Sequence, residues 1–189
     1  MKDLIAERSR ELGLGRDGFL ALLLSVMVGS AVMGWLYEMG FYYLDSGGTW
    51  VARGHGIGPW LPIYGFGGLG MLLICWKVRD RPLLTFALSG LVAAVLEYAT
   101  GYVLYTFFDG LRLWDYNTEI WNWGNVDGYI CARSILLFAA AGVALMRWLL
   151  PLLANVIRRV GERRALLASG IVAALYAADI IFGYLVRGL

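Results

Sequence analysis

The hydrophobic residues of the chain fall in five long blocks that are separated by shorter polar stretches. The blocks cover about residues 19–44, 60–76, 83–108, 127–153 and 165–186. A helix needs about 20 mostly apolar residues to cross ~30 Å of hydrocarbon, and the block at 60–76 meets this length only just. Because the blocks show no alternating strand pattern, helices are the expected spans. The sequence therefore predicts an all-α, polytopic membrane helical bundle of about five transmembrane helices.

The composition supports a membrane protein with a single domain. Hydrophobic residues make up 60% of the 189 residues, more than a soluble domain of this size could bury. Residues 1–17 are polar and of mixed charge, and they are expected to form a short amphipathic segment on the membrane surface. Residues 18–189 form the predicted transmembrane domain, because the chain is too short for two bundles.

The basic residues predict how the bundle lies in the membrane. They gather before the first block and in every second turn: Lys2, Arg8, Arg10, Arg16, then Lys77, Arg79, Arg81, then Arg158, Arg159, Arg163 and Arg164. The other two loops hold only Arg53 and Arg112. The positive-inside rule therefore places the N-terminus in the cytoplasm and the C-terminus outside. We expect a multi-pass protein of the cell membrane, the inner or plasma membrane.

Charged residues inside the apolar blocks are the first candidates for a functional site. Glu38, Glu97 and Asp179 lie within three blocks, and Arg133 lies at the start of a fourth. An ionised side chain in lipid costs a few kcal/mol or more, so such residues usually face a protein interior or a wet cavity. Glu97 lies ~22 Å along its predicted helix. An ion pair from Arg133 to Glu38 or Glu97 is the simplest way to satisfy these groups.

Each of these acids also has a structural interpretation. Glu38 could reach the interface as a surface residue among aromatic neighbours such as Tyr42, four residues further on. Glu97 could be protonated or held in a structural pair. Asp179 lies among small residues in a block without another motif, which favours a packing or hydrogen-bonding role over a place in the site.

The loop after the first block is rich in glycine. Arg53 to Gly68 holds six glycines and two prolines in sixteen residues. Such a segment brings the backbone close to a ligand or to a neighbouring helix, and Arg53 beside glycine is a candidate anion contact. The alternative is a tight re-entrant turn with small-residue packing. His55, the only histidine, is interpreted as an exposed loop residue and not as a catalytic base.

The second long loop combines aromatic, acidic and amide side chains. Trp114, Asp115 and Tyr116 follow the third block, and Thr100 lies one turn after Glu97. Stacking faces beside an acceptor suit a cation, a sugar or a lipid headgroup. The alternative is an amphipathic loop that its tryptophans hold at the membrane interface. Both loops face outward in the predicted orientation.

Several kinds of chemistry lack a signature in this sequence. There is no Gly-Lys phosphate loop, no paired-cysteine or multi-histidine metal motif, and no Ser-His-Asp set. We therefore predict no cofactor and no metal, and the absence of a basic stripe outside the membrane flanks argues against nucleic acid. Cys75 and Cys131 are expected near opposite membrane faces, which excludes a disulfide and leaves them as packing residues.

An ordered set of motifs resembles one protein family. The segments are GWLYE at Gly34–Glu38, the glycine-rich segment Arg53–Gly68, Leu96–Glu97 with Thr100–Gly101, WDY at Trp114–Tyr116, and GYIC at Gly128–Cys131. Together, over roughly Met27 to Ser134, they resemble the type IV ABC-transporter permease family, also called CmpB-like. The resemblance implies a small multi-pass membrane protein. It carries over Glu38, Arg53, Gly54, Gly58, Pro59, Pro62, Tyr64, Gly65, Glu97, Thr100, Gly101, Trp114, Asp115, Tyr116 and Gly128 as motif positions. The family often has Asn where this chain has Ala52, and a bulky apolar residue where it has His55.

The leading hypothesis is an outward-facing polar and aromatic pocket that binds, and in its stronger form transports, a small solute or lipid headgroup. Its predicted substrate-binding residues are Glu38, Arg53, Tyr64, Glu97, Thr100, Trp114, Asp115, Tyr116 and Arg133, with no catalytic residue assigned. Two alternatives stay open: an intramembrane enzyme on a lipid substrate with Glu97 or Asp115 as general base, and a non-catalytic assembly subunit. The expected partners are membrane lipid, the unknown ligand, and a second copy or another membrane subunit.

Overall fold

The computed structural model is all-helical and describes residues 2–54 and 56–187. In chain order the elements are α1 (Lys2–Glu11), α2 (Arg16–Asp45), α3 (Pro62–Cys75) with a 3-10 turn η1 (Trp76–Val78), α4 (Pro82–Phe107), α5 (Ala132–Ala144), a π-helical turn η2 (Leu145–Leu149), α6 (Leu150–Val160) and α7 (Glu162–Arg187). Because α5, η2 and α6 follow one another without a break, they act as one long helix.

Within the described residues, four helices are long and apolar enough to cross a membrane. They are Arg16–Asp45, Pro82–Phe107, Ala132–Val160 and Glu162–Gly183. The block expected at 60–76 is a shorter apolar helix, Pro62–Val78. Pro62 explains the late start, because proline suits the first turn of a helix and the preceding residue stays extended. Of the five or so predicted spans, four are therefore helices long enough to cross a membrane, and the fifth is a shorter apolar helix.

The fourth predicted block also differs at its start. The helix begins at Ala132 and not near residue 127. Asp127 and Gly128 have φ of +53° and +77°, a left-handed backbone that no helix contains. Residues 127–131 therefore belong to the preceding loop. At its other end this helix continues to Val160, with Pro151 accommodated directly after the π-helical turn.

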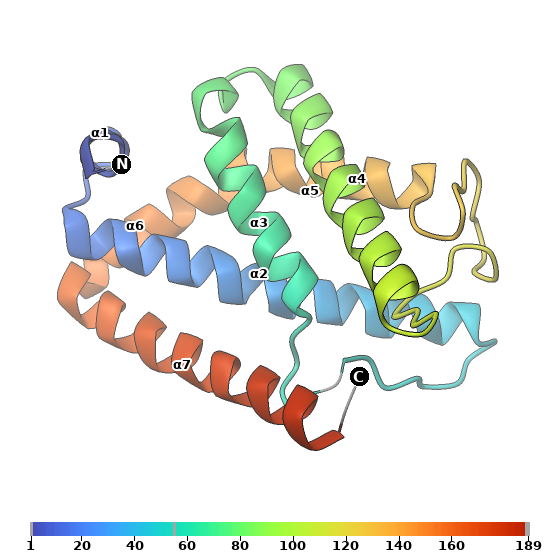
Figure 1. Cartoon of the computed structure of the whole chain (residues 1–189). Coiled ribbons are helices and arrows are strands. Elements are labelled where there is room, and N and C mark those ends of the chain that lie inside the picture. Colours follow the sequence, from blue (N-terminus) through green and yellow to red (C-terminus); the bar gives the residue numbers. More distant parts are fainter. Residues whose placement is uncertain (1, 55, 188–189) are drawn as a thin grey trace.

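Helix α2 is the centre of the bundle. It packs against α3, α6 and α7, while α4 packs against α3 and α5 (Figure 1). The main core lies in the half of the bundle nearest α1 and includes Phe19, Leu22, Leu72, Trp76 and Leu150. Burial of these side chains fixes the crossing of α2 with α3 and α6.

Small residues allow the helices to pack closely. A Cβ added to Gly34 of α2 would lie 2.1 Å from the ring of Tyr64 in α3, and one added to Gly68 would lie 2.1 Å from Ser30 Oγ. At the α4–α5 contact, a Cβ on Gly142 would lie 2.0 Å from Ser89 Oγ. Small-residue packing, one of the two interpretations of the glycine-rich segment, is therefore present at the start of α3.

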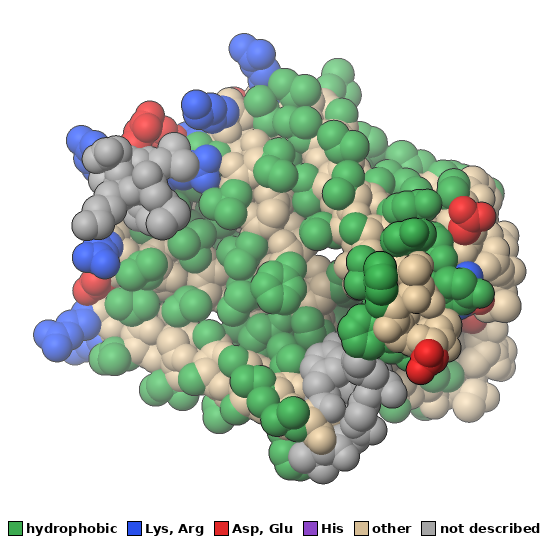
Figure 2. Space-filling model, in the orientation of Figure 1, with side chains coloured by type: hydrophobic (Ala, Val, Ile, Leu, Met, Phe, Trp, Pro, Cys, Tyr) green, Lys and Arg blue, Asp and Glu red, His purple; other side chains and the backbone are tan. Residues whose placement is uncertain are grey.

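The two ends of the bundle differ in charge. One end, called the basic end, contains α1, the α3–α4 turn and the α6–α7 turn, and Figure 2 shows Lys and Arg side chains gathered along that edge. The other, called the polar end, holds the loops 46–61 and 108–131. The cysteines are buried and free, as expected. The charge difference agrees with the basic turns on which the predicted orientation rests.

Candidate functional site

A network of polar and charged side chains lies at the polar end, where the outer turns of four helices meet the two loops. We call it the polar cluster. Its members are Glu38 and Tyr42 of α2, Arg53 of the first loop, Tyr64 of α3, Glu97 of α4, Tyr116 and Glu119 of the second loop, and Arg133 and Ser134 of α5. Six of its nine members come from residues predicted for the site.

The first part of the cluster is the ion pair of Glu38 with Arg53. Arg53 Nε donates to Glu38 Oε2 at 2.6 Å, and the hydroxyl of Tyr64 donates to the other oxygen at 2.9 Å. The guanidinium stacks on the ring of Tyr42 at 3.8 Å and donates to the carbonyl of Leu113. Burial acts to lower the pKa of Arg53, but the Glu38 carboxylate together with Tyr42 and Tyr64 acts in the other direction, and the net effect is a raised pKa. Arg53 therefore stays charged.

The second part is an ion pair of Arg133 with Glu119. The two side chains are 2.7 Å apart, and Arg133 also donates to the carbonyl of Ile120 at 2.8 Å. Tyr42 donates to the second oxygen of Glu119. The expected partner of Arg133 was Glu38 or Glu97, and this is corrected: the second loop folds back over the helix ends and brings Glu119 to Arg133. Both side chains are largely buried, at 13% and 4% exposure.

The third part is Glu97 of α4. Its side chain is buried, and it accepts hydrogen bonds from the hydroxyls of Tyr116 at 2.6 Å and Ser134 at 2.9 Å. Among the described residues, no Lys or Arg forms an ion pair with it. Burial, and next the Glu97 carboxylate, raise the pKa of Tyr116 well above its usual value, so its hydroxyl keeps the proton that it donates.

Three predicted site residues lie outside the cluster. Trp114 donates from its indole to the carbonyl of Tyr129. Asp115, a candidate general base, instead accepts from the backbone and side-chain amides of Asn117 at 3.0 and 2.8 Å and thereby holds a loop turn. Thr100 is half-buried in α4, and its hydroxyl has no hydrogen-bond partner in the described part of the chain. His55 lies outside the described residues.

Sequence reasoning did not select three members of the cluster: Tyr42, Glu119 and Ser134. Tyr42 lies four residues after Glu38, on the same helix face, and Ser134 directly follows Arg133. The positions of both in the sequence could therefore have identified them as site candidates. Glu119 lies in a loop between aromatic residues, and nothing in its local pattern indicates that it meets Arg133. No group of three His, Cys, Asp or Glu residues that could hold a metal occurs in the residues described.

Asp179 holds the first loop against α7. Its carboxylate accepts from the backbone amides of Ile57 and Gly58 and from the indole of Trp60, at 2.7–3.1 Å. This is the hydrogen-bonding role that the sequence favoured. Because the same loop carries Arg53, Asp179 positions one arm of the polar cluster from outside it.

Asp179→Ala should release this loop without unfolding the bundle. Each charge-assisted hydrogen bond to an aspartate contributes at most about 1.5–3 kcal/mol. Because these bonds tie the loop to α7, their loss should favour local opening of the loop and not unfolding of the bundle. Amide hydrogen exchange at Ile57 and Gly58 should speed by tenfold or more, while amides in the core of α2 keep their protection. Unchanged exchange at both loop amides would show that Asp179 does not hold the loop.

The comparison with protein families agrees with the motifs. The sequence model of the family described as "Putative ABC-transporter type IV" matches residues 25–184. No curated protein matches this chain, and no solved structure matches it. The match extends beyond the stretch expected from the motifs and includes most of α7. The chain is therefore a multi-pass membrane protein that belongs to the Putative ABC-transporter type IV family.

Proposed function

We propose that this protein is a membrane transport component whose polar cluster binds a small solute or lipid headgroup through a positively charged amine. The basic turns support an orientation with the cluster toward the outside. The observation that carries the proposal is the charge balance of the cluster. Glu38 pairs with Arg53 and Glu119 with Arg133, whereas Glu97 is held by two hydroxyls. The cluster has one acid more than it has bases.

The position of Glu97 supports an amine as the ligand. A buried carboxylate without an opposite charge is costly, and two hydroxyl donors offset only part of that cost. An ammonium group at Glu97 would complete the charge balance. Aromatic rings of this region already hold cations, because Arg53 lies 3.8 Å over Tyr42 and Arg133 lies 4.0 Å over Phe41.

The second loop supports a closed form of this site. Tyr116 covers Glu97 from the loop, and the carbonyls of Leu113 and Ile120 are bound by Arg53 and Arg133. In this structure the cluster side chains contact one another. None of them lines the groove between α2, α6 and α7 that is described below, or the smaller hollow beside Arg79 and Met146 at the basic end. Entry of a ligand therefore requires the loop to lift, with the amine taking the place of the Tyr116 hydroxyl at Glu97.

Glu97→Gln tests the proposal. Glutamine keeps the shape and one acceptor oxygen, for the Tyr116 hydroxyl, but removes the charge. Its amide can donate to the Ser134 hydroxyl, which still donates to the carbonyl of Cys131, so the melting temperature should stay within a few degrees of the parent. We expect ethanolamine or phosphatidylethanolamine to raise the melting temperature of the parent, and this rise to be lost in the variant. Glu11→Gln, which removes an acid from the basic end, should keep the response.

The two probes distinguish the source of the amine. A response to free ethanolamine indicates a solute, and a response to phosphatidylethanolamine alone indicates a lipid headgroup. An equal rise in parent and Glu97→Gln would overturn the proposed site, and so would the absence of a response to either amine. A fall of ten degrees or more in the variant without ligand would assign Glu97 a structural role instead.

A further inference from the structure

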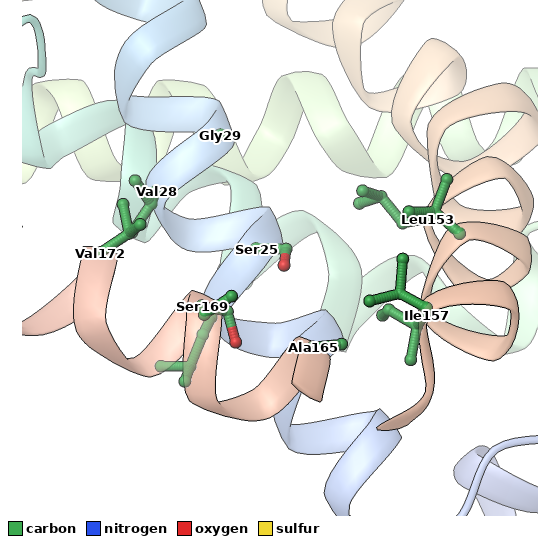
Figure 3. A pocket seen from close by; sticks show the side chains of 12 residues that line it. Ser25, Val28, Gly29, Leu153, Ile157, Ala165, Ser169 and Val172 are labelled. Atoms are coloured by element: carbon green, nitrogen blue, oxygen red, sulfur yellow. The ribbon is translucent and has the colours of Figure 1, made fainter. Parts of the chain in front are cut away.

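A groove runs between α2, α6 and α7 in the half of the bundle that contains the basic end. Its volume is about 410 Å³, and its lining residues are Leu24, Ser25, Val28, Gly29, Leu153, Val156, Ile157, Val160, Ala165, Ala168, Ser169 and Val172. Figure 3 shows Leu153 and Ile157 of α6 pointing across it toward the side chains of α2 and α7. Ser25 and Ser169 are the only polar side chains in this lining. The groove is separate from the polar cluster.

The length of the groove fits one leaflet of a membrane. It follows α6 from Leu153 to Val160 and α7 from Ala165 to Val172, which at 1.5 Å per residue is ~10 Å. One leaflet supplies about half of the ~30 Å of hydrocarbon. The groove therefore lies alongside the acyl chains of that leaflet and ends at the α6–α7 turn.

Two arginines flank the groove at this turn. Arg164 precedes the lining residue Ala168 by four positions on α7, and Arg159 follows Val156 by three on α6, so each lies one turn from the groove wall. Both are exposed, and neither guanidinium has a hydrogen bond or ion pair within residues 2–54 and 56–187. Two unpaired cations at the end of an apolar groove match the phosphate of a lipid whose chain lies in the groove.

Of the other charged groups of the turn, Glu162 and Arg158 are already engaged, whereas Arg163 is exposed on the side of α7 away from the lining residue Val172. The carboxylate of Glu162 accepts from the backbone amides of Gly15 and Gly18 at 2.8 and 3.0 Å. Arg158 donates to the carbonyl of Leu12 and to the side chain of Asn155. Glu162 therefore does not neutralise the two free arginines, and Arg158 holds α1 to α6 instead of facing a ligand.

We propose that the groove binds one acyl chain of an anionic phospholipid, with its phosphate between Arg159 and Arg164. Charge complementarity selects an anionic lipid over a zwitterionic one, because two arginines meet a headgroup with net negative charge. This site lies at the opposite end of the bundle from Glu97, and its occupant differs from the amine proposed there.

The test measures lipid binding to the purified full chain by native mass spectrometry. Phosphatidylglycerol should bind at least about tenfold more tightly than phosphatidylcholine with the same acyl chains. The double variant Arg159→Gln/Arg164→Gln should weaken phosphatidylglycerol binding about tenfold or more. The matched double variant Lys77→Gln/Arg81→Gln removes the same charge from the α3–α4 turn and should keep the parent affinity.

A second pair of variants tests the groove itself. Gly29→Leu fills the groove from its floor, and a Cβ at Gly29 meets nothing within 4 Å, so the fold should tolerate it. Gly40→Leu is the control, because Gly40 lies on the same helix, has equally open space and is outside the groove. Gly29→Leu should lose the lipid and Gly40→Leu should keep it. The proposal would be overturned if the two lipids bound equally or if Gly29→Leu bound lipid as well as the parent does. It would also be overturned if the parent formed a dimer that Gly29→Leu abolished, because a second copy of the chain would then occupy the groove.

Discussion

Glu119→Gln should destabilise the protein more than any other conservative change in the polar cluster. The variant leaves Arg133 largely buried with its charge partner removed, and removing one member of a buried ion pair costs about 3–5 kcal/mol. It also weakens the acceptor of the Tyr42 hydroxyl. The melting temperature of the detergent-purified protein should fall by about ten degrees or more, and the far-ultraviolet helix signal should show one earlier transition.

Two controls show whether the buried charge is the cause. Glu11→Gln breaks a partly exposed ion pair with Arg79 and should change the melting temperature little. Glu119→Gln/Arg133→Met removes both charges from the buried pair and should regain most of the lost stability. If Glu119→Gln has the same melting temperature as the parent, the ion pair with Arg133 does not hold the second loop to α5.

Gly34→Val should have the second largest effect. A Cβ at Gly34 would overlap the ring of Tyr64, at 2.1 Å, and Tyr64 donates to Glu38 from the first turns of α3. The added side chain must push α3 away from α2, and such overpacking costs about 1–3 kcal/mol, with the loss of the Tyr64–Glu38 hydrogen bond in addition. The measurement is again the melting temperature in detergent.

Gly40→Val is the matched control for Gly34→Val. Gly40 lies on the same helix two turns nearer its end, and a Cβ there meets nothing within 4 Å. It should leave the melting temperature unchanged or raise it slightly, because glycine is a poor helix former. Equal melting temperatures for the two variants would show that α2 and α3 do not pack through Gly34.

The helices were predictable from the sequence because their signal is local. Long apolar blocks define α2, α4, the α5–α6 helix and α7, and the number of residues in each block indicates the length of its helix. The start of α5 was misplaced because residues 127–131 are apolar and aromatic enough to continue the block. The left-handed backbone at Asp127 and Gly128 and the extended backbone at Cys131 exclude them from a helix, and a hydropathy pattern does not contain backbone angles.

The site residues that lie in or beside apolar helices were predictable from the sequence, because a charge stands out there. Glu38, Glu97 and Arg133 stand out because lipid makes their charge costly, and the structure buries them together with Arg53, Tyr64 and Tyr116. The pairing could not be predicted, because Glu119 reaches Arg133 only after the second loop folds back over the helix ends. Trp114 and Asp115 lie in the same loop, but their side chains hydrogen-bond to other residues of that loop and not to the polar cluster. The spacing of residues in the sequence does not reveal this difference.

A high-resolution density map would show directly whether a ligand lies against the unpaired carboxylate of Glu97. The map should be determined for the protein in lipid discs that contain phosphatidylethanolamine, with free ethanolamine added to a second sample. We expect density against the Glu97 carboxylate in one of the two samples, with Tyr116 moved away from it. Tyr116 at hydrogen-bond distance from Glu97 in both samples, with no density beside the carboxylate, would contradict it.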